Sequence, residues 1–252
     1  EVRIRGCRTV TRTSESGHWS SMIALSIIIP TLNEEAGIAS ALDALATLRV
    51  TGCEVIVADG GSGDRTAALA RPRCDQIVAT PRGRGAQMNA GAAAARGEVL
   101  LFLHADTRLP DGADQLILRE LARSKRVWGR FDVRIAGRHP LLGLVACLMN
   151  WRSRLTGIAT GDQAIFVECS AFVAAGRFPD SPLMEDIALS ARLRCVTPPV
   201  CLAARATTSG RRWDDHGFMR TIVLMWRLRA AFFRGTDPAT LARAYGYAPR
   251  EP

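Results

Sequence analysis

The chain has 252 residues, of which 48% are hydrophobic and 23% charged, so it can bury one large core and is not a disordered protein. Its formal net charge of +9 at pH 7 favours an anionic partner, such as a nucleotide or a phospholipid surface. No nucleic-acid-binding motif is present, which argues against nucleic acid as a partner.

The cysteines and the apolar runs indicate in which cellular compartment the protein is expected. The 7 cysteines are an odd number and include no Cys-x-x-Cys pair, which is typical of reduced thiols in a cytosolic protein. No uninterrupted apolar run reaches the roughly 18 residues that a membrane-spanning helix needs. We therefore expect a cytoplasmic protein, either free or held peripherally on the inner face of the membrane.

The chain is expected to contain one domain between two tails. Residues 1–21 have neither helical nor strand periodicity and lack the apolar centre of a signal peptide, so we expect a disordered tail there. No linker or internal repeat divides residues 22–235, which we take as one domain with halves at 22–110 and 111–235. Residues 236–252 are expected to form a C-terminal tail.

Strands and helices alternate in the first half. Short β-branched and apolar runs are typical of buried strands, and apolar residues at helical spacing indicate the helices between them. We predict strands at 23–29, 53–58, 75–79 and 99–103, and helices within 33–48, 60–70 and 82–97. This alternation predicts an α/β fold with a mostly parallel sheet and right-handed crossovers.

The second half alternates less regularly. We predict helices at 112–125, 141–151, 184–194 and 218–233, and strands at 126–136, 162–168 and 198–204. The helices at 141–151 and 218–233 have two interpretations. Core helices are the default, but arginines and aromatic residues interleave in 218–233, as they do where a helix lies at a membrane interface.

Polar residues follow three strands of the first half at the point where each strand ends. They are Pro30, Thr31, Asn33 and Glu34 after the first strand, Asp59, Gly60, Ser62 and Asp64 after the second, and His104 and Asp106 after the fourth. Ligands of open α/β sheets bind beyond the carboxyl ends of the strands, so we expect a nucleotide pocket there. The alternative is that these residues only form turns and cap helices.

Two further features favour a phosphorylated ligand at this edge. Asp106, at the end of a central strand, is placed to hold a metal ion beside a phosphate. Arg82 and Arg84 precede a predicted helix, where guanidinium groups and free helix N–H groups together suit a diphosphate. The alternative for the two arginines is a solvated loop.

The ordered series IIIPTLNEE, VIVADGGSGDRT, RGRGAQMNAG and LLFLHADTRLP resembles family-2 glycosyltransferases of the GT-A fold. With GDQAIFV and MEDIALSARLR added, it resembles the bacterial subgroup linked with arsenosugar biosynthesis. The similarity covers about residues 23–233. The resemblance implies transfer of a sugar from a nucleoside diphosphate sugar to a hydroxyl group, with inversion at the anomeric carbon, a divalent metal ion (Mn or Mg) and a preference for uridine.

The resemblance also implies roles for the residues of the first half, 22–110, as the nucleotide-sugar side. Thr31, Glu34 and Asp59 would contact the nucleoside, and Asp106 would bind the metal ion. The usual Asp-x-Asp is here His104-Ala105-Asp106, which leaves one firm carboxylate ligand and predicts a weakly held metal ion. We expect His104 to pack or to donate a hydrogen bond outside the metal's first shell.

Glu185 and Asp186, at a predicted helix start, match the family's Glu-Asp pair, whose Asp is the general base. An inverting transfer needs a carboxylate that removes the proton of the acceptor hydroxyl as its oxygen attacks. Asp186 is the candidate. The alternative is that both acids only favour the positive end of the helix dipole.

The residues of the second half, 111–235, are expected on the acceptor side. They are Gly161, Asp162, Gln163 and Trp213. Arg212 and Trp213 resemble the end of the family's Gln-x-x-Arg-Trp, but Ser209 replaces Gln, which favours a single transfer over polymer synthesis. Arg212 would neutralise the departing diphosphate. His216 is a weak candidate for a further metal ligand.

Two other functions compete with this interpretation. A nucleotidyltransferase that makes nucleotide sugars would need a Gly-rich loop with a basic residue near the first strand, which PTLNEE lacks. A nucleotide-binding scaffold that has lost catalysis would explain the missing first acid of the Asp-x-Asp. A small molecule and a lipid both remain as acceptor classes.

Overall fold

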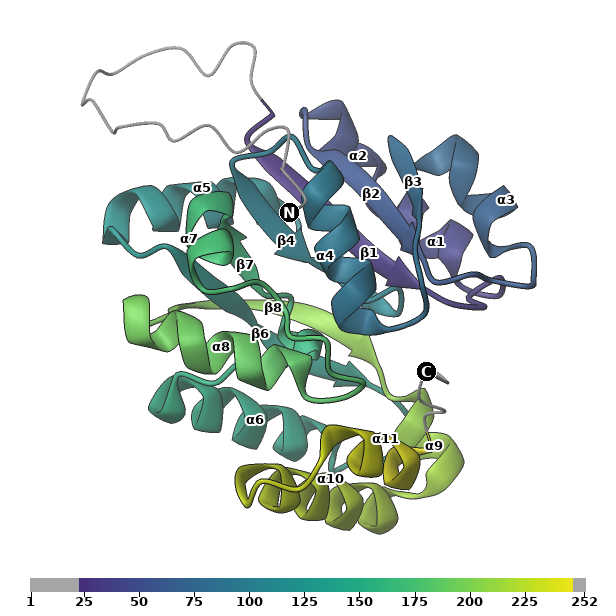
Figure 1. The fold of residues 1–252 in the computed structure, drawn as a ribbon, viewed down its shortest axis with the longest axis vertical. Coiled ribbons are helices and arrows are strands. Elements are labelled where there is room, and N and C mark those ends of the chain that lie inside the picture. The colour runs from purple at the N-terminus through teal and green to yellow at the C-terminus, as the bar shows by residue number, and fades with distance from the viewer. Residues whose placement is uncertain (1–22, 247–252) are drawn as a thin grey trace.

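The structure, a computed structural model, describes residues 23–246 (Figure 1). In this part of the chain eight strands form one sheet, in the order β3-β2-β1-β4-β7-β6-β8-β5. The apolar runs predicted from the sequence occupy its centre, because strands covered on both faces must be apolar on both. The sheet therefore divides the domain into two helical layers.

The first four strands are parallel, as their alternation with helices predicts. They are β1 (Leu25–Thr31), β2 (Glu54–Asp59), β3 (Gln76–Ala79) and β4 (Val99–Phe102). Strand β1 lies between β2 and β4, and Thr31 is opposite Asp59 in the β1–β2 register. The polar residues that follow β1, β2 and β4 thus meet at one edge of the sheet.

The second half makes the sheet mixed rather than mostly parallel. Its strands are β5 (Thr107–Arg108), β6 (Trp128–Ala136), β7 (Phe166–Glu168) and β8 (Val200–Ser209). Strand β7 runs antiparallel to both β4 and β6, β8 is parallel to β6, and β5 is antiparallel to β8. A two-residue strand such as β5 carries too few residues for a sequence pattern, and it was missed.

Helices cover both faces of the sheet. One face carries α1 (Ile38–Asp43), α2 (Ala46–Val50), α3 (Thr66–Ala70), the 3-10 turn η1 (Arg71–Arg73) and α5 (Ala113–Ser124), and the other carries α4 (Arg84–Ala94), α7 (Cys169–Ala174) and α8 (Glu185–Val196). Alternate residues of β1 separate the two cores: Ile27 packs with α1, α2 and α5, whereas Ile28 packs with α4, α7 and α8. This separation arises because successive side chains of a strand point to opposite faces of the sheet.

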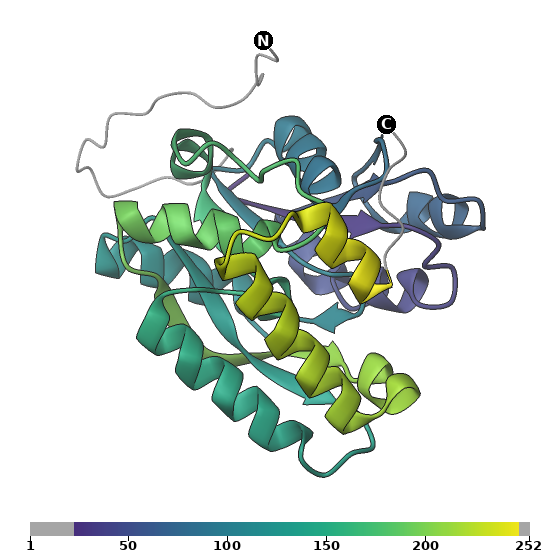
Figure 2. The same ribbon diagram turned by 60° about the horizontal axis from the view of Figure 1, so that its bottom comes forward.

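The remaining helices form an outer group beside β6 and β8 (Figure 1). They are α6 (Leu142–Thr156), α9 (Arg211–His216), α10 (Phe218–Phe233) and α11 (Pro238–Tyr245). Helices α6 and α10 lie side by side in both views (Figures 1 and 2). No helix within residues 23–246 combines the length and the apolar character needed to cross a membrane.

Three expected elements differ from the structure. The helix expected at 33–48 is broken into α1 and α2, and the strand expected at 162–168 is a 3-10 turn, η2 (Gly161–Gln163), followed by β7. Residues 238–245 of the expected tail form α11, which packs Leu241 and Ala242 against α10. The tail expected at 1–21 lies outside the described residues.

Candidate functional site at the strand ends and the start of α8

The ends of β1 and β2 are joined by hydrogen bonds around Asp59. Its carboxylate accepts from the Thr31 hydroxyl at 3.4 Å and from the backbone N–H groups of Gly61 and Ser62 at 3.2 and 3.0 Å. The Ser62 hydroxyl donates to it as well, at 2.5 Å. Asp59 is only 8% exposed. The carboxylate at the end of β2 therefore holds the turn that follows it, in which Gly61 and Gly63 are exposed.

The loops after β1 and β2 hold each other through side chains. Asn33, which adopts a left-handed backbone conformation with φ 53°, accepts from the Gly63 N–H at 2.9 Å through its side-chain oxygen. Asp64 precedes α3 and accepts from the N–H of Thr66, the first residue of that helix, at 2.9 Å. The Thr66 hydroxyl accepts in turn from the Glu34 N–H at 2.8 Å. Asp64 thus holds the turn that leads into α3.

Gln87 also fixes this edge, and the sequence analysis did not single it out. Its side-chain amide donates to the carbonyl oxygens of Thr31 at 2.7 Å and Ala58 at 2.9 Å, and it is 3% exposed. A Cβ atom on Gly60 would lie 3.0 Å from this amide, so a side chain at position 60 would crowd it. The only sequence feature that could have pointed to Gln87 is its position within an Ala-rich predicted helix.

Glu34 and Asp106 face the same region from neighbouring loops. Burial raises the pKa of Glu34, and the negative charges of Asp106 and Asp64 raise it further, against the opposing charges of Arg211 and Arg84. Charges influence one another in this way only when they are close. The expected convergence of Glu34 with Asp106 is thus present. Arg211 joins them from α9, a helix that the sequence did not predict.

Asp106 is the predicted metal ligand, and its surroundings limit how a metal ion could bind. It is exposed, and its Oδ1 accepts from the Thr107 hydroxyl at 3.3 Å. Within residues 23–246 no group of three or more His, Cys, Asp or Glu side chains is placed to hold an ion. Mg²⁺ in phosphate-binding sites takes one or two carboxylates and completes its shell with water and phosphate oxygens. The residues present fit an ion carried on a diphosphate.

A second cluster forms where α8 begins. Asp186 accepts hydrogen bonds from the backbone N–H of Gly161 at 2.6 Å and from that of Ile187 at 2.7 Å. Glu185 is 3% exposed, and its pKa is raised by burial and by the charge of Asp186. The two acids therefore have different surroundings. Asp186 is held by donors at the rim, and Glu185 points into the protein.

His104 joins the second cluster to the end of β4. Its Nδ1 lies 3.5 Å from an Asp162 carboxylate oxygen. Burial would raise the pKa of Asp162, but the hydrogen bond and charge of His104, with the charges of two arginines, lower it overall. A Cβ atom on Gly161 would lie 2.4 Å from the imidazole, so only glycine fits there. His104 thus lies against Gly161 and Asp162, and the outer-shell role expected for it stays a prediction.

Arg84 lies between the two clusters. It is the first residue of α4, after Gly83, whose φ of 140° is accessible mainly to glycine. Its Nη1 lies 4.0 Å from Glu185, and its charge acts on Glu34 as well. The acids around it raise the pKa of Arg84 although burial opposes the charge. One guanidinium group thus faces both the strand ends and the start of α8.

Other predicted site residues have structural contacts or lie apart. Arg212 stacks over the Tyr245 ring, 3.6 Å from its centroid, and donates to the Tyr245 carbonyl at 2.7 Å, so it holds α11 instead of facing a diphosphate. Trp213 packs against Phe218, and Gln163 is fully buried. The expected roles of these three residues toward the diphosphate or the acceptor stay predictions. Pro30 lies half-buried within β1, and Arg82 and His216 are exposed.

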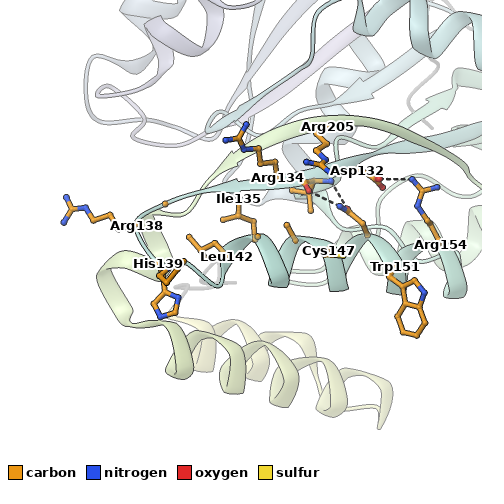
Figure 3. A pocket seen from close by; sticks show the side chains of 16 residues that line it. Asp132, Arg134, Ile135, Arg138, His139, Leu142, Cys147, Trp151, Arg154 and Arg205 are labelled. Carbon is orange, nitrogen blue, oxygen red and sulfur yellow. Dashed lines mark hydrogen bonds and ion pairs between the residues drawn. The ribbon is translucent and has the colours of Figure 1, made fainter.

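A separate groove of about 590 Å³ lies between α6 and the edge formed by β6 and β8 (Figure 3). Arg134, Arg138, Arg154 and Arg205 line it together with Trp151. None of the predicted site residues lines it. A small hollow instead lies at the second cluster, lined by His104, Gly161, Glu185 and Asp186 among others.

Comparison with known proteins gives one family match and several curated relatives. Residues 26–172, more than half of the chain, match the model of Glycosyl transferase family 2. An uncharacterized glycosyltransferase of Mycobacterium tuberculosis (strain H37Rv) is 32% identical over 135 residues, which cover 52% of this chain and 60% of the relative. The match thus spans well under two thirds of that relative's length.

Solved structures share the fold at low sequence identity. S. aureus TarS in complex with UDP-GlcNAc has a TM-score of 0.61 at 18% identity, covering 74% of this chain and 58% of TarS. The mannosyltransferase PcManGT from Pyrobaculum calidifontis, in complex with GDP-Man and Mn²⁺, has a TM-score of 0.60 at 19% identity, covering 90% of this chain and 70% of the other. These structures confirm the expected α/β fold of GT-A type.

Proposed function

Because the chain belongs to glycosyl transferase family 2, we propose that it transfers one sugar, with inversion, from a nucleoside diphosphate sugar to a hydroxyl acceptor. One observation carries this proposal: Arg84 acts on Glu34 and on Glu185, so the strand ends and the start of α8 face one region. A donor at the strand ends would place its anomeric carbon toward Asp186. Donor and base would then lie on opposite sides of the reacting carbon.

We propose a uridine nucleotide as the donor's leaving group. TarS binds UDP-GlcNAc, whereas PcManGT binds GDP-Man with Mn²⁺, so the shared fold accommodates either base in those proteins. In this chain Thr31, Asp59 and Ser62 would offer polar atoms to a nucleoside at the ends of β1 and β2. The resemblance to the arsenosugar-associated subgroup stays a prediction about the pathway.

The diphosphate would lie between the guanidinium groups of Arg84 and Arg211 and the carboxylate of Asp106. A divalent ion bound there would supply positive charge that stabilises the departing diphosphate. Asp106 would hold that ion, while Arg84 at the start of α4 would add charge and the free N–H groups of the helix end. Arg211 takes the role that the sequence analysis gave to Arg212.

Asp186 would act as the general base. Its two backbone hydrogen bonds, from Gly161 and Ile187, fix the direction of the carboxylate without using every lone pair. An acceptor hydroxyl beside Asp186 would lose its proton to the free lone pair as its oxygen attacks the anomeric carbon. The Gly161–His104 contact holds the backbone that orients Asp186.

The transfer can be tested by screening nucleotide sugars and following the phosphorus-containing product. We expect nucleoside diphosphate to be released from one donor, and the release to be lost in Asp106→Ala. Pyrophosphate formed from a sugar phosphate and a nucleoside triphosphate would instead indicate a nucleotidyltransferase. If calorimetry shows no nucleotide binding with or without Mn²⁺, the non-catalytic scaffold becomes the better description.

We also propose that α6 and α10 contact an anionic membrane surface. Their outward apolar residues follow helical spacing and are about half exposed or more: Leu144, Leu148, Trp151 and Leu155 on α6, and Met219, Val223 and Trp226 on α10. Neither helix contains an acidic residue, and exposed Arg220 and Arg227 interleave with the apolar residues of α10. Such a surface suits the headgroup region of anionic lipids. Trp151 points away from the sheet (Figure 3).

A further inference from the structure

Two arginines on neighbouring helices lie beside the start of α8. Arg152 is on the face of α6 that carries Val145 and Met149, which pack against the same buried cluster as Phe218 at the start of α10. Arg229 lies on the same side of α10 as Phe218, about three turns further along. Both side chains are therefore directed into the region between α6, α8 and α10, while the apolar stripes of these helices face outward.

The Arg152 guanidinium has two buried nitrogens without a partner within the described residues. Its Nε and one terminal nitrogen, Nη2, are buried and form no hydrogen bond with any residue from 23 to 246. Nearby Arg130 also has a buried Nε without a partner, but both of its terminal nitrogens are bonded, since it pairs with Asp132 and donates to the Asn150 carbonyl at 3.1 Å. In the described residues no carboxylate forms an ion pair with Arg152 or Arg229. Buried donors without partners are rare and costly.

The charges of the two arginines act on each other and on Asp186. Burial lowers the pKa of Arg152 to about 10, the charge of Arg229 lowers it further, and Asp186 opposes the shift. Burial also lowers the pKa of Arg229, against the charges of Asp186 and Asp162. Two cations of this kind are unfavourable together unless an anion lies between them. The carboxylates that act on them belong to the proposed acceptor side of the site.

We infer that Arg152 and Arg229 form a subsite for an anionic group of the acceptor, a phosphate or a carboxylate, beside the hydroxyl that Asp186 deprotonates. The assignment of the anion to a sugar acceptor rests on the proposed function, but the anion-binding site itself does not. A phosphate or carboxylate accepts the paired N–H groups of a guanidinium in a bidentate manner, and a doubly charged phosphate neutralises both cations. The subsite would therefore select anionic over neutral acceptors and fix which hydroxyl reaches Asp186.

Anion binding can be measured without donor, metal ion or transfer. The probes are inorganic phosphate and malonate in thermal unfolding, with ionic strength matched by chloride. We expect one of them to raise the Tm by about 3 °C at roughly ten times its Kd. Arg152→Gln and Arg229→Gln should lose most of this rise, and without anion their Tm should not fall, because each removes an unfavourable buried charge.

Arg227→Gln is the matched control, since Arg227 lies on the same helix but is exposed. It should keep the full rise in Tm. Absence of a rise with either anion, or a rise that persists in both subsite variants, overturns the inference. Arg229→Lys adds a further check, because lysine keeps the positive charge but cannot donate two parallel hydrogen bonds as a guanidinium does. It should keep part of the rise in Tm.

Transfer kinetics then decide whether the bound anion belongs to the acceptor. At saturating donor, Arg229→Gln should raise the acceptor KM by about 10- to 100-fold, the effect of one lost hydrogen bond to a charged group. The donor KM should stay within about twofold. A changed donor KM with an unchanged acceptor KM would overturn the assignment to the acceptor. The anion-binding measurements contain no donor. A failure of the proposed transfer would therefore be distinguished from a failure of the proposed anion site.

Discussion

Asp186→Asn isolates the proposed base with the smallest change in shape. The variant keeps one side-chain oxygen that can accept from a backbone N–H, but loses the carboxylate that accepts a proton. General-base catalysis contributes about 10²- to 10⁴-fold, so kcat should fall by that factor, which corresponds to about 2.7–5.5 kcal/mol of barrier. Donor affinity should be unchanged, because Asp186 lies on the acceptor side of the proposed site.

The same substitution should also lower the free energy of unfolding, by an amount that follows from the hydrogen bonds of Asp186. Asp186 accepts from Gly161 at 2.6 Å and from Ile187 at 2.7 Å, and Asn can retain only one of these bonds. The lost bond to a charged acceptor costs about 1.5–3 kcal/mol of folding free energy, or about 3–12 °C in Tm. An assay well below the lowered Tm therefore separates lost chemistry from lost stability.

Asp75→Asn supplies the matched control. Asp75 also accepts from a backbone N–H, that of Val55 at 2.8 Å, but it precedes β3 and so lies at the opposite edge of the sheet. It should lose stability and keep kcat. The measurements are initial rates of nucleoside diphosphate release and calorimetry of the donor. If Asp186→Asn retains kcat within about threefold, or loses donor affinity in proportion to activity, Asp186 is not the base.

Three further perturbations test other parts of the site. Asp106→Ala should weaken Mn²⁺-dependent nucleotide binding by at least about tenfold in calorimetry, and binding that is equally strong with chelator would contradict the metal role. The pKa of Glu34 is raised, so its ionisation destabilises the fold as pH rises through that value; Glu34→Gln should raise the Tm at pH 8 but not at pH 4. An equal gain at both pH values would contradict this. Trp151→Glu and Trp226→Glu should each reduce sedimentation with anionic vesicles by about tenfold, whereas neutral vesicles should bind little of any variant.

Local sequence patterns were sufficient for the sheet and for the residues at its ligand edge. The apolar runs around Ile28 and Leu100 predicted buried strands, because a strand covered on both faces has few alternatives. The polar residues that follow such strands must lie at their carboxyl ends. The convergence of Glu34 and Asp106 therefore followed from the parallel arrangement, and an added Cβ at Gly60 or Gly161 would crowd Gln87 or His104.

The sequence by itself determined the family, the parallel half of the sheet and the acids at its edge, since these depend on periodicity within short segments. Only the tertiary structure decided that Arg211 faces Glu34 while Arg212 binds Tyr245, because neighbouring helical residues point about 100° apart and the packing of α11 sets which one turns inward. It alone brought Arg152 and Arg229 together from helices separated by more than 60 residues of chain. Contacts between residues so far apart in the chain depend on how whole helices pack, and they cannot be predicted from a local sequence pattern.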